Sequence, residues 1–419
     1  GAAPLEAARQ TLKRLHGAFA LCFLFEGEND LMIAARKGSP LAIGHGEGEM
    51  FVGSDAIALA PMTDRVTYLE EGDYAVITRA GAVIYDDDDR LANRAETRIE
   101  LDATRIEKAG YKHFMAKEVA EQPVVIADAL RRYVTSGQDA LPALRLPAEV
   151  DFSGVDRITM VACGTASYAT HIAKYWFEQI AGIAVEIDIA SEFRYREPPL
   201  SPQQWALFVS QSGETADTLA ALRYTRDKAD LVASLVNVGT SSIAREADVA
   251  LAILAGIEVS VASTKAYTNQ LTILALLALQ AARQKGVIDD TECKALVTDL
   301  KSVPDQMRQT LALEGEIAKL AEAIAPAQSV LFLGRGVMYA TALEAALKLK
   351  ELSYIHAEAY ASGELKHGPI ALIDRSLPVV VFAPHDRLFE KTVSNMQEVM
   401  ARHGRVTLIT DAKGAALAG

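Results

Sequence analysis

The feature that most constrains the fold of this chain is a regular alternation of short apolar runs and helical patterns, which begins near Asp156. Short apolar runs bounded by turn residues are typical of buried strands. The predicted strands are residues 158–162, 184–190, 206–209 and 231–236, and helical patterns stand between them at 167–180 and from 216 onward. This alternation predicts an α/β fold, in which helices flank a parallel sheet on both faces. Ligands of such sheets bind beyond the carboxyl ends of the strands.

The same pattern returns later in the chain, after a long helical connector predicted at residues 292–324. Residues 329–336 again read as a strand that ends in a glycine turn. Two short sequences recur at the same spacing, which are Tyr-Ala-Thr at 168–170 and 339–341, and Ala-Ser at 190–191 and 361–362. Such self-similarity indicates two copies of one structural unit. We therefore expect tandem α/β units, the second of which stops early, after a strand at 406–409.

The loop that follows the third predicted strand is suited to binding an anion. Residues 210–215 read SQSGET, so that Ser210, Ser212 and Thr215 supply hydroxyls and Gly213 lets the backbone come close. The first amides of the helix that follows have no partner within it, and the helix dipole favours negative charge there. The loop lacks the lysine of a nucleotide P-loop, and a smaller dianion such as a sugar phosphate fits better. An ordinary capped helix start would also carry these residues.

Two further loops at predicted strand ends share this character. Residues 163–165 and the sequence VASTK at 261–265 are again rich in small and hydroxyl residues. The coincidence of three such loops at one edge of a sheet favours a phosphate or sugar site over a merely capped helix. Cys163 stands at a strand end with no evident base beside it, so we interpret it as a packing or lining residue and not as a nucleophile.

Composition excludes several classes of protein. The net charge of −13 argues against a nucleic-acid surface as the main function. Cys22, Cys163 and Cys293 lie far apart, which excludes a disulfide framework or a thiolate zinc site and suits a reducing cytoplasm. The most apolar helical pattern, at 271–282, is shorter than the roughly 20 residues that cross a membrane.

The first 100 residues have a different sequence pattern, which predicts short strands joined by tight turns. The expected elements are a helix at 5–15 and strands at 19–25, 30–35, 50–53, 65–69 and 74–79. From Asp102 to Gln122 the sequence turns charged and irregular, which indicates a domain boundary. We predict three domains: residues 1–100, residues 101–285 with the linker at their start, and residues 286–419, which open with the helical connector.

The second repeat carries candidate acid–base groups. Glu344, Lys348 and Glu351 are spaced by four and three residues, which places them on one face of a helix predicted at 342–355. A surface ion-pair ladder would have the same spacing. In the loop beyond, His367 could exchange protons near neutral pH, while Glu351 could move a proton between adjacent sugar carbons. We interpret His356 as a packing residue.

Four motifs together closely resemble the glucosamine-6-phosphate synthase family, along essentially the whole chain. They are SQSGET at 210–215, VASTK at 261–265, LEAALKLKE at 343–351 and ELKHGP at 364–369. The family makes glucosamine 6-phosphate from fructose 6-phosphate and glutamine, the first step toward UDP-N-acetylglucosamine, and isomerises the sugar as it does so. The resemblance implies tandem SIS (sugar isomerase) domains after a β-rich, incomplete N-terminal-nucleophile glutaminase domain. RKGSP at 36–40 and LEEGD at 69–73 carry that last similarity.

The resemblance also implies a role for each site residue. Glu351 would shuttle the proton between C1 and C2, Lys348 would support the developing charge, and His367 would open the ring from the neighbouring subunit of a homodimer. The remaining residues would bind substrate: Ser210, Gln211, Ser212 and Thr215 the phosphate, and Thr165, Val261 and Ser263 the sugar. No metal or organic cofactor is expected, because proton transfer needs only positioned acids, bases and donors.

The chain departs from the family at both ends. The catalytic N-terminal cysteine of the glutaminase and the C-terminal lysine that forms a Schiff base with the sugar are not in this sequence. We therefore expect a fragment that binds sugar phosphates and does not turn over glutamine. Ala166 also stands where many relatives have a serine.

Two alternatives remain at this point. One is a SIS-domain deaminase or isomerase of amino-sugar phosphates that uses free ammonia, against which the β-rich block at the start of the chain argues. The other is a sugar-phosphate sensor without chemistry, against which the retention of Glu351, Lys348 and His367 argues.

Overall fold

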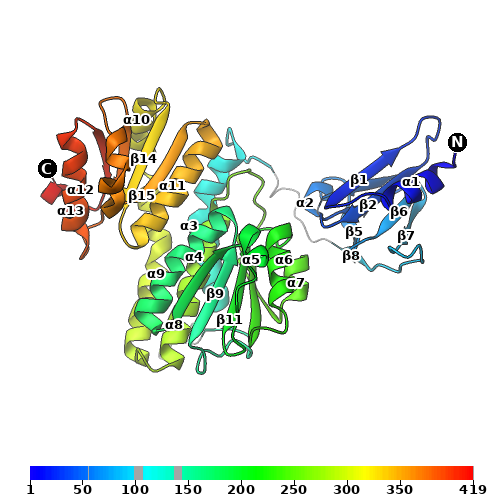
Figure 1. The fold of residues 1–419 in the computed structure, drawn as a ribbon, viewed down its shortest axis with the longest axis horizontal. Helices are drawn as coiled ribbons and strands as arrows, with labels where there is room; N and C mark the ends of the chain where they lie inside the picture. Colours follow the sequence, from blue (N-terminus) through cyan, green and yellow to red (C-terminus); the bar gives the residue numbers. More distant parts are fainter. Residues whose placement is uncertain (55, 99–106, 136–143, 419) are drawn as a thin grey trace. The chain divides into compact units, whose positions relative to one another are not determined.

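The computed structural model describes residues 1–54, 56–98, 107–135 and 144–418. The chain divides into two compact units, residues 1–109 and residues 110–419. Figure 1 labels many of the elements of both units.

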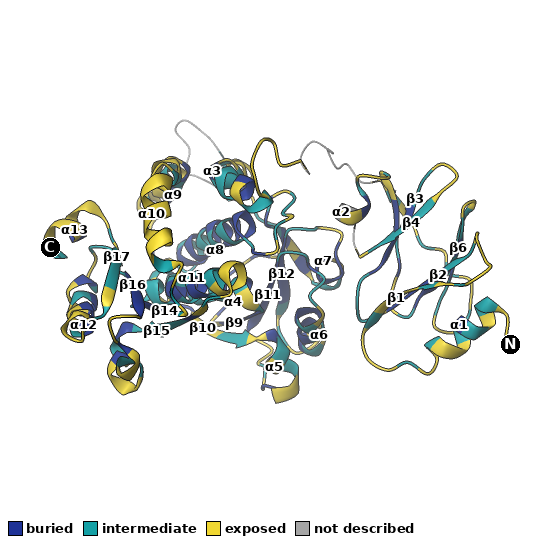
Figure 2. Ribbon diagram, turned by 90° about the horizontal axis from the view of Figure 1, so that it is seen from above, coloured by how far each residue is buried: buried dark blue, intermediate teal, exposed yellow. Residues whose placement is uncertain are grey.

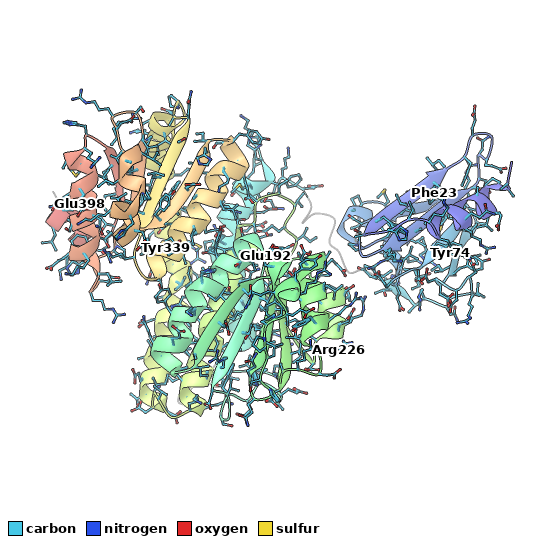
Figure 3. All side chains as sticks on the ribbon, in the orientation of Figure 1. Phe23, Tyr74, Glu192, Arg226, Tyr339 and Glu398 are labelled. Carbon is cyan, nitrogen blue, oxygen red and sulfur yellow. The ribbon has the colours of Figure 1, made fainter. Side chains whose placement is uncertain are left out.

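The first unit holds two antiparallel sheets that enclose a small core. One sheet has the order β1 (Phe19–Leu24), β2 (Met32–Lys37), β6 (Tyr74–Thr78) and β7 (Gly81–Tyr85), and the other the order β4 (Met50–Gly53), β3 (Ala42–His45), β5 (Arg65–Tyr68) and β8 (Glu96–Arg98). Its helices are α1 (Pro4–Leu12) and α2 (Ala56–Leu59). Buried Ala34, Ile43 and Ile77 bring side chains of both sheets into one cluster. Tyr74, which Figure 3 labels, lies in this unit. It stacks on Tyr85 with ring centroids 5.2 Å apart.

The second unit begins with α3 (Phe114–Tyr133), which leads into the first repeat. Its parallel sheet has the order β10 (Ala184–Ile189), β9 (Arg157–Ala162), β11 (Trp205–Ser210), β12 (Leu231–Val236) and β13 (Val249–Ala252). The helices are α4 (Gly164–Trp176) with its continuation η2 (Phe177–Ala181), α5 (Ala190–Arg196), α6 (Ala216–Thr225), α7 (Ser242–Glu246) and α8 (Lys265–Gln284). Buried side chains of α3, α4 and α8 form one cluster, and those of α5, α6 and α7 form another. The sheet is therefore covered on both faces (Figure 2), as the alternation predicts.

The second repeat follows two connecting helices, α9 (Asp290–Leu311) and α10 (Glu314–Ile324). Its parallel sheet has the order β15 (His356–Ala361), β14 (Ser329–Gly334), β16 (Pro378–Phe382) and β17 (Arg405–Ile409). Its helices are α11 (Val337–Ser353), the 3₁₀ turns η3 (Ser362–His367) and η4 (Pro369–Leu372), α12 (Phe389–Ala401) and α13 (Ala412–Ala418). Ala342 and Ala346 of α11 pack on one face of this sheet, and Phe389 and Met396 of α12 on the other.

Several expectations need correction. The segment 102–122 was expected to be irregular, but from Phe114 it is the start of α3; residues 102–106 lie outside the described ones. The sequence did not predict this helix because its segment contains several charges and Pro123, and proline usually ends a helix. The connector is broken at residues 312–313. His356 is exposed at the start of β15, 3.6 Å from a Glu358 carboxylate oxygen, so it is not a packing residue. Among the described residues, no helix is long and apolar enough to span a membrane.

Candidate active site

A cavity of about 260 Å³ opens at the carboxyl ends of β9 and β11. It brings together side chains from both repeats, because α11 of the second repeat borders it. The predicted site residues that line it are Thr165, Ser210, Gln211, Ser212, Thr215, Val261, Ser263, Lys348 and Glu351. His367 is exposed on η3 and is not part of this lining.

The loop between β11 and α6 is held in shape by its own side chains. The Ser210 hydroxyl accepts a hydrogen bond from the Gly213 amide at 3.0 Å and lies 3.0 Å from the Thr215 hydroxyl. The Ser212 hydroxyl accepts from the Glu214 amide at 3.1 Å. Gly213 has a φ of +68°, and a Cβ there would lie 2.0 Å from the Ser241 hydroxyl oxygen, so only glycine fits.

The same loop is fastened to its surroundings. The Gln211 carbonyl accepts from the Asn237 amide, and the Gly213 carbonyl accepts from the Ile243 amide, both at 3.0 Å. The Glu214 carboxylate accepts from the Ser242 amide at 2.8 Å. A loop with this many fixed contacts is preorganised, so ordering it around a ligand has a low entropic cost.

The second wall of the cavity is one face of α11. Lys348 Nζ lies 2.6 Å from Glu351 Oε2 and 3.4 Å from Glu344 Oε1. It also donates to the Thr165 hydroxyl at 2.9 Å, and that hydroxyl lies 3.2 Å from Glu344 Oε1. The three α11 side chains are therefore part of a network that reaches the first repeat, and not a surface ladder.

Glu344 is the acid of this network whose pKa is clearly shifted. Its side chain is buried, and burial raises its pKa from 4.5 to about 7, although the Lys348 charge and the Thr165 hydrogen bond act in the opposite direction. Among the described residues, its Oε2 is one of the buried oxygens without a hydrogen-bond partner. A carboxyl with a pKa near neutrality can hold or release a proton under cellular conditions.

The third wall is the loop before α8. The Glu258 carboxylate accepts from the Ser263 hydroxyl at 2.9 Å and from the Thr264 amide at 2.7 Å, so it caps the start of α8. Glu258, Ser260 and Gln270 also line the cavity, and sequence reasoning did not name them. An acid shortly before a predicted helix start, and a glutamine beside the apolar run 271–282, are the signals that could have found two of them.

The floor of the cavity includes Cys163 and Ala166. Cys163 therefore lines the cavity, as interpreted from the sequence. Ser167, the next residue of α4, is buried and does not replace a serine at position 166, since it is not among the lining residues.

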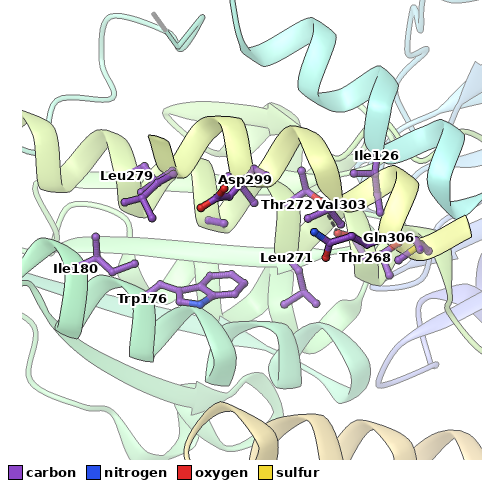
Figure 4. A pocket seen from close by; sticks show the side chains of 14 residues that line it. Ile126, Trp176, Ile180, Thr268, Leu271, Thr272, Leu279, Asp299, Val303 and Gln306 are labelled. Atoms are coloured by element: carbon purple, nitrogen blue, oxygen red, sulfur yellow. Dashed lines mark hydrogen bonds between the residues drawn. The ribbon is translucent and has the colours of Figure 1, made fainter. Parts of the chain in front are cut away.

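A second cavity, of about 450 Å³, lies among α3, α4, α8 and α9 (Figure 4). Its walls are mostly apolar, with Trp176, Leu271 and Leu300 among them. The hydroxyl of Thr272, one of the polar residues in the wall, donates a hydrogen bond to the Thr268 carbonyl at 2.8 Å, within the same helix. No group of three or more metal-ligating side chains occurs among the described residues.

A protein-family model described as SIS domain matches residues 151–280 and 323–419. These stretches hold the two parallel sheets, so the chain is a SIS-domain protein, as predicted.

A glutamine–fructose-6-phosphate aminotransferase (isomerizing) of Bradyrhizobium diazoefficiens is 55% identical over 99% of this chain and 68% of its own length. One of Brucella abortus is 56% identical, with the same coverage. A solved structure, the C-terminal domain of glucosamine-fructose-6-phosphate aminotransferase from Francisella tularensis, matches with a TM-score of 0.71 and 42% identity over 74% of this chain and 87% of that one. The chain belongs to the glutamine–fructose-6-phosphate aminotransferase (isomerizing) family, which confirms the resemblance read from the motifs.

Proposed function

We propose that this chain carries the sugar-phosphate isomerase part of an enzyme that converts fructose 6-phosphate and glutamine to glucosamine 6-phosphate. The observation that carries the proposal is that the 210–215 loop and the acid–base face of α11 line one cavity. The names of the relatives support the choice of fructose 6-phosphate among sugar phosphates.

The phosphate binds at the loop between β11 and α6. Ser210, Gln211, Ser212 and Thr215 line the cavity there, beside the N-terminus of α6. Hydroxyl donors and the positive end of a helix favour a dianion. Thr165, Val261 and Ser263 contact the sugar.

The proton moves between C1 and C2 of the open sugar by way of Glu351. A carboxylate in an adjoining wall can remove a proton from one carbon and return it to the next, through an enediol-like species. Lys348, which lies 2.6 Å from Glu351, stabilises the negative charge that develops on the sugar oxygen.

The ring is opened by His367 of a neighbouring copy in a homodimer. In support of this, His367 is exposed on η3 and is not part of the cavity lining of its own chain.

The first unit, with its antiparallel sheets, belongs to a glutaminase domain that supplies ammonia. We place the enzyme in the cytoplasm, because its cysteines are all free thiols. The domain limits 1–100, 101–285 and 286–419 stay a prediction.

Replacing Glu351 with Gln tests the catalytic part of this proposal in the full-length enzyme. The variant should bind glucosamine 6-phosphate within about threefold of the parent, because the loop at 210–215 is intact. Exchange of the C1 and C2 hydrogens with deuterated solvent, followed by NMR, should fall by at least about 10²-fold. Exchange that persists at the parental rate would remove Glu351 from the proton transfer. A parent that binds the sugar and never exchanges its hydrogens would instead favour the sensor.

A further inference from the structure

A buried carboxylate outside the cavity holds one of its walls. Glu118 lies on the first turns of α3, and only 2% of it is exposed. Its Oε1 accepts hydrogen bonds from two successive amides, Val259 at 2.6 Å and Ser260 at 3.1 Å. Its Oε2 accepts from the Ser260 hydroxyl. Glu118 is 141 residues away from Val259 in the chain, so the contact is a tertiary one.

These bonds account for the burial of a charged group. A carboxylate without partners in the interior is strongly disfavoured, whereas one that accepts from several donors is stable and holds them firmly. Here both partners of Glu118 belong to one short segment. Consecutive amides aimed at one oxygen fix the path of that segment's backbone.

The segment that Glu118 holds is the wall that faces the sugar. Ser260, Val261 and Ser263 line the cavity, and the Val261 side chain is fully exposed to solvent. On its other side the segment is tied to the start of α8 by Glu258. The loop 258–263 is thus fastened by two carboxylates, of which only Glu118 comes from another element.

The same helix, α3, also forms an ion pair with the start of α8. Glu121, one turn after Glu118, lies 2.7 Å from the buried Lys265 Nζ, the first residue of α8, and 3.6 Å from Lys117 Nζ. One helix therefore contacts both the loop and the element that follows it, which keeps the loop from moving as a hinge.

We propose that Glu118 is a positioning residue for the sugar site: it fixes the backbone of the loop 258–263 so that Val261 and Ser263 meet the substrate. It does not touch the substrate itself. The role in substrate binding rests on the proposed function; the fixing of the loop does not.

The test compares Glu118→Ala and Glu118→Gln with a control at an exposed carboxylate, Asp248→Ala. Asp248 also accepts a hydrogen bond from a main-chain amide, that of Val232 at 2.8 Å, but it is not among the residues that line the cavity. Glu118→Gln keeps the volume of the side chain and an oxygen that can accept both amides, but it loses the negative charge that strengthens these bonds and the oxygen that accepts from the Ser260 hydroxyl. It therefore remains informative if Glu118→Ala does not fold. Amide hydrogen exchange of residues 257–264 is measured without ligand, and glucosamine 6-phosphate affinity by calorimetry.

In Glu118→Ala the Val259 and Ser260 amides should exchange at least about tenfold faster, and the sugar phosphate should bind about tenfold more weakly. In Glu118→Gln both effects should be smaller, about threefold, because neutral hydrogen bonds to these amides are weaker than those to a carboxylate. Asp248→Ala should change neither. Unchanged loop exchange in Glu118→Gln, or faster exchange with parental affinity, would overturn the proposal. If exchange quickens but the parent itself binds no sugar phosphate, the fixing of the loop stands and the proposed function fails.

Discussion

At the scale of single residues, the cavity depends on a hydroxyl that bridges two repeats. Thr165, the second residue of α4, accepts from Lys348 and lies 3.2 Å from Glu344, both on α11. The bridging hydroxyl joins an ammonium to a buried carboxyl, so the charges of the three groups are coupled. Glu344 Oε1 lies 3.4 Å from Lys348 Nζ, so ionisation of Glu344 changes the electrostatic environment of that ammonium.

The Glu344→Gln variant should gain stability relative to the parent as the pH rises from about 5 to about 8. The quantity compared is the free energy of unfolding of the two proteins at each pH. The pKa of Glu344 is about 7 in the folded chain and 4.5 as the unperturbed value. Between those values the unfolded state loses a proton that the folded state keeps, so the unfolding free energy of the parent falls with pH. The shift is equivalent to roughly 3 kcal/mol at most. Urea unfolding of both proteins across this range measures the difference, and parallel profiles would contradict it.

The burial of Glu344 illustrates what the sequence could and could not predict. Spacing predicts that Glu344, Lys348 and Glu351 share a face of a helix, because the helical period is local. It does not predict that this face packs against Thr165, since that contact joins residues 179 positions apart. For the same reason the sequence offered no partner for Glu118.

At the scale of elements, the site is a strand that ends in a rigid loop before a helix. Predicted and observed bounds agree at β12, Leu231–Val236, and at the first residue of α6, Ala216. Strand runs bounded by turn residues and a clear helix start are strong local signals. Agreement is poorer where the signal is weak: β3 contains Gly44, and β8 is only Glu96–Arg98, and neither was predicted.

Gly213→Ala should weaken sugar-phosphate binding, while Gly182→Ala should not. Both glycines have a positive φ, +68° and +66°, so either alanine costs about 1 kcal/mol of stability through the backbone alone. At Gly213 the new Cβ would also lie 2.5 Å from Ser241 Cβ, whereas at Gly182 it meets nothing within 4 Å. We expect at least about 2 kcal/mol of additional destabilisation in Gly213→Ala.

Thermal unfolding and calorimetric titration of the two variants measure the contrast. A sugar-phosphate affinity at least about tenfold weaker in Gly213→Ala, with parental affinity in Gly182→Ala, supports the loop as the phosphate site. Equal effects of the two substitutions on affinity would mean that the path of this loop does not matter.

At the scale of the whole molecule, the two repeats share a fold and contribute different walls to one cavity. The first supplies the hydroxyl loop after β11, and the second supplies α11 with its acid–base face. The corresponding strand of the second repeat, β16, is followed by a loop whose His385 amide donates to the Asp411 carboxylate at 2.5 Å. The loop after β16 thus contacts a carboxylate of the chain itself, whereas the loop after β11 is held by its own hydroxyls. The sequence predicted both the repeat and the assignment of the loop to the first copy and of the acid–base groups to the second, but it did not predict the contact through Thr165 that joins them.

The most direct test of the account is a calorimetric titration of this chain with glucosamine 6-phosphate, beside the double variant Ser210→Ala/Thr215→Ala and beside glucosamine without its phosphate. The account predicts saturable binding of the sugar phosphate to the parent, a loss of at least about tenfold in the double variant, and no measurable heat from the unphosphorylated sugar. Equal affinity of the parent and the double variant for the sugar phosphate would contradict the claim that this loop holds the phosphate.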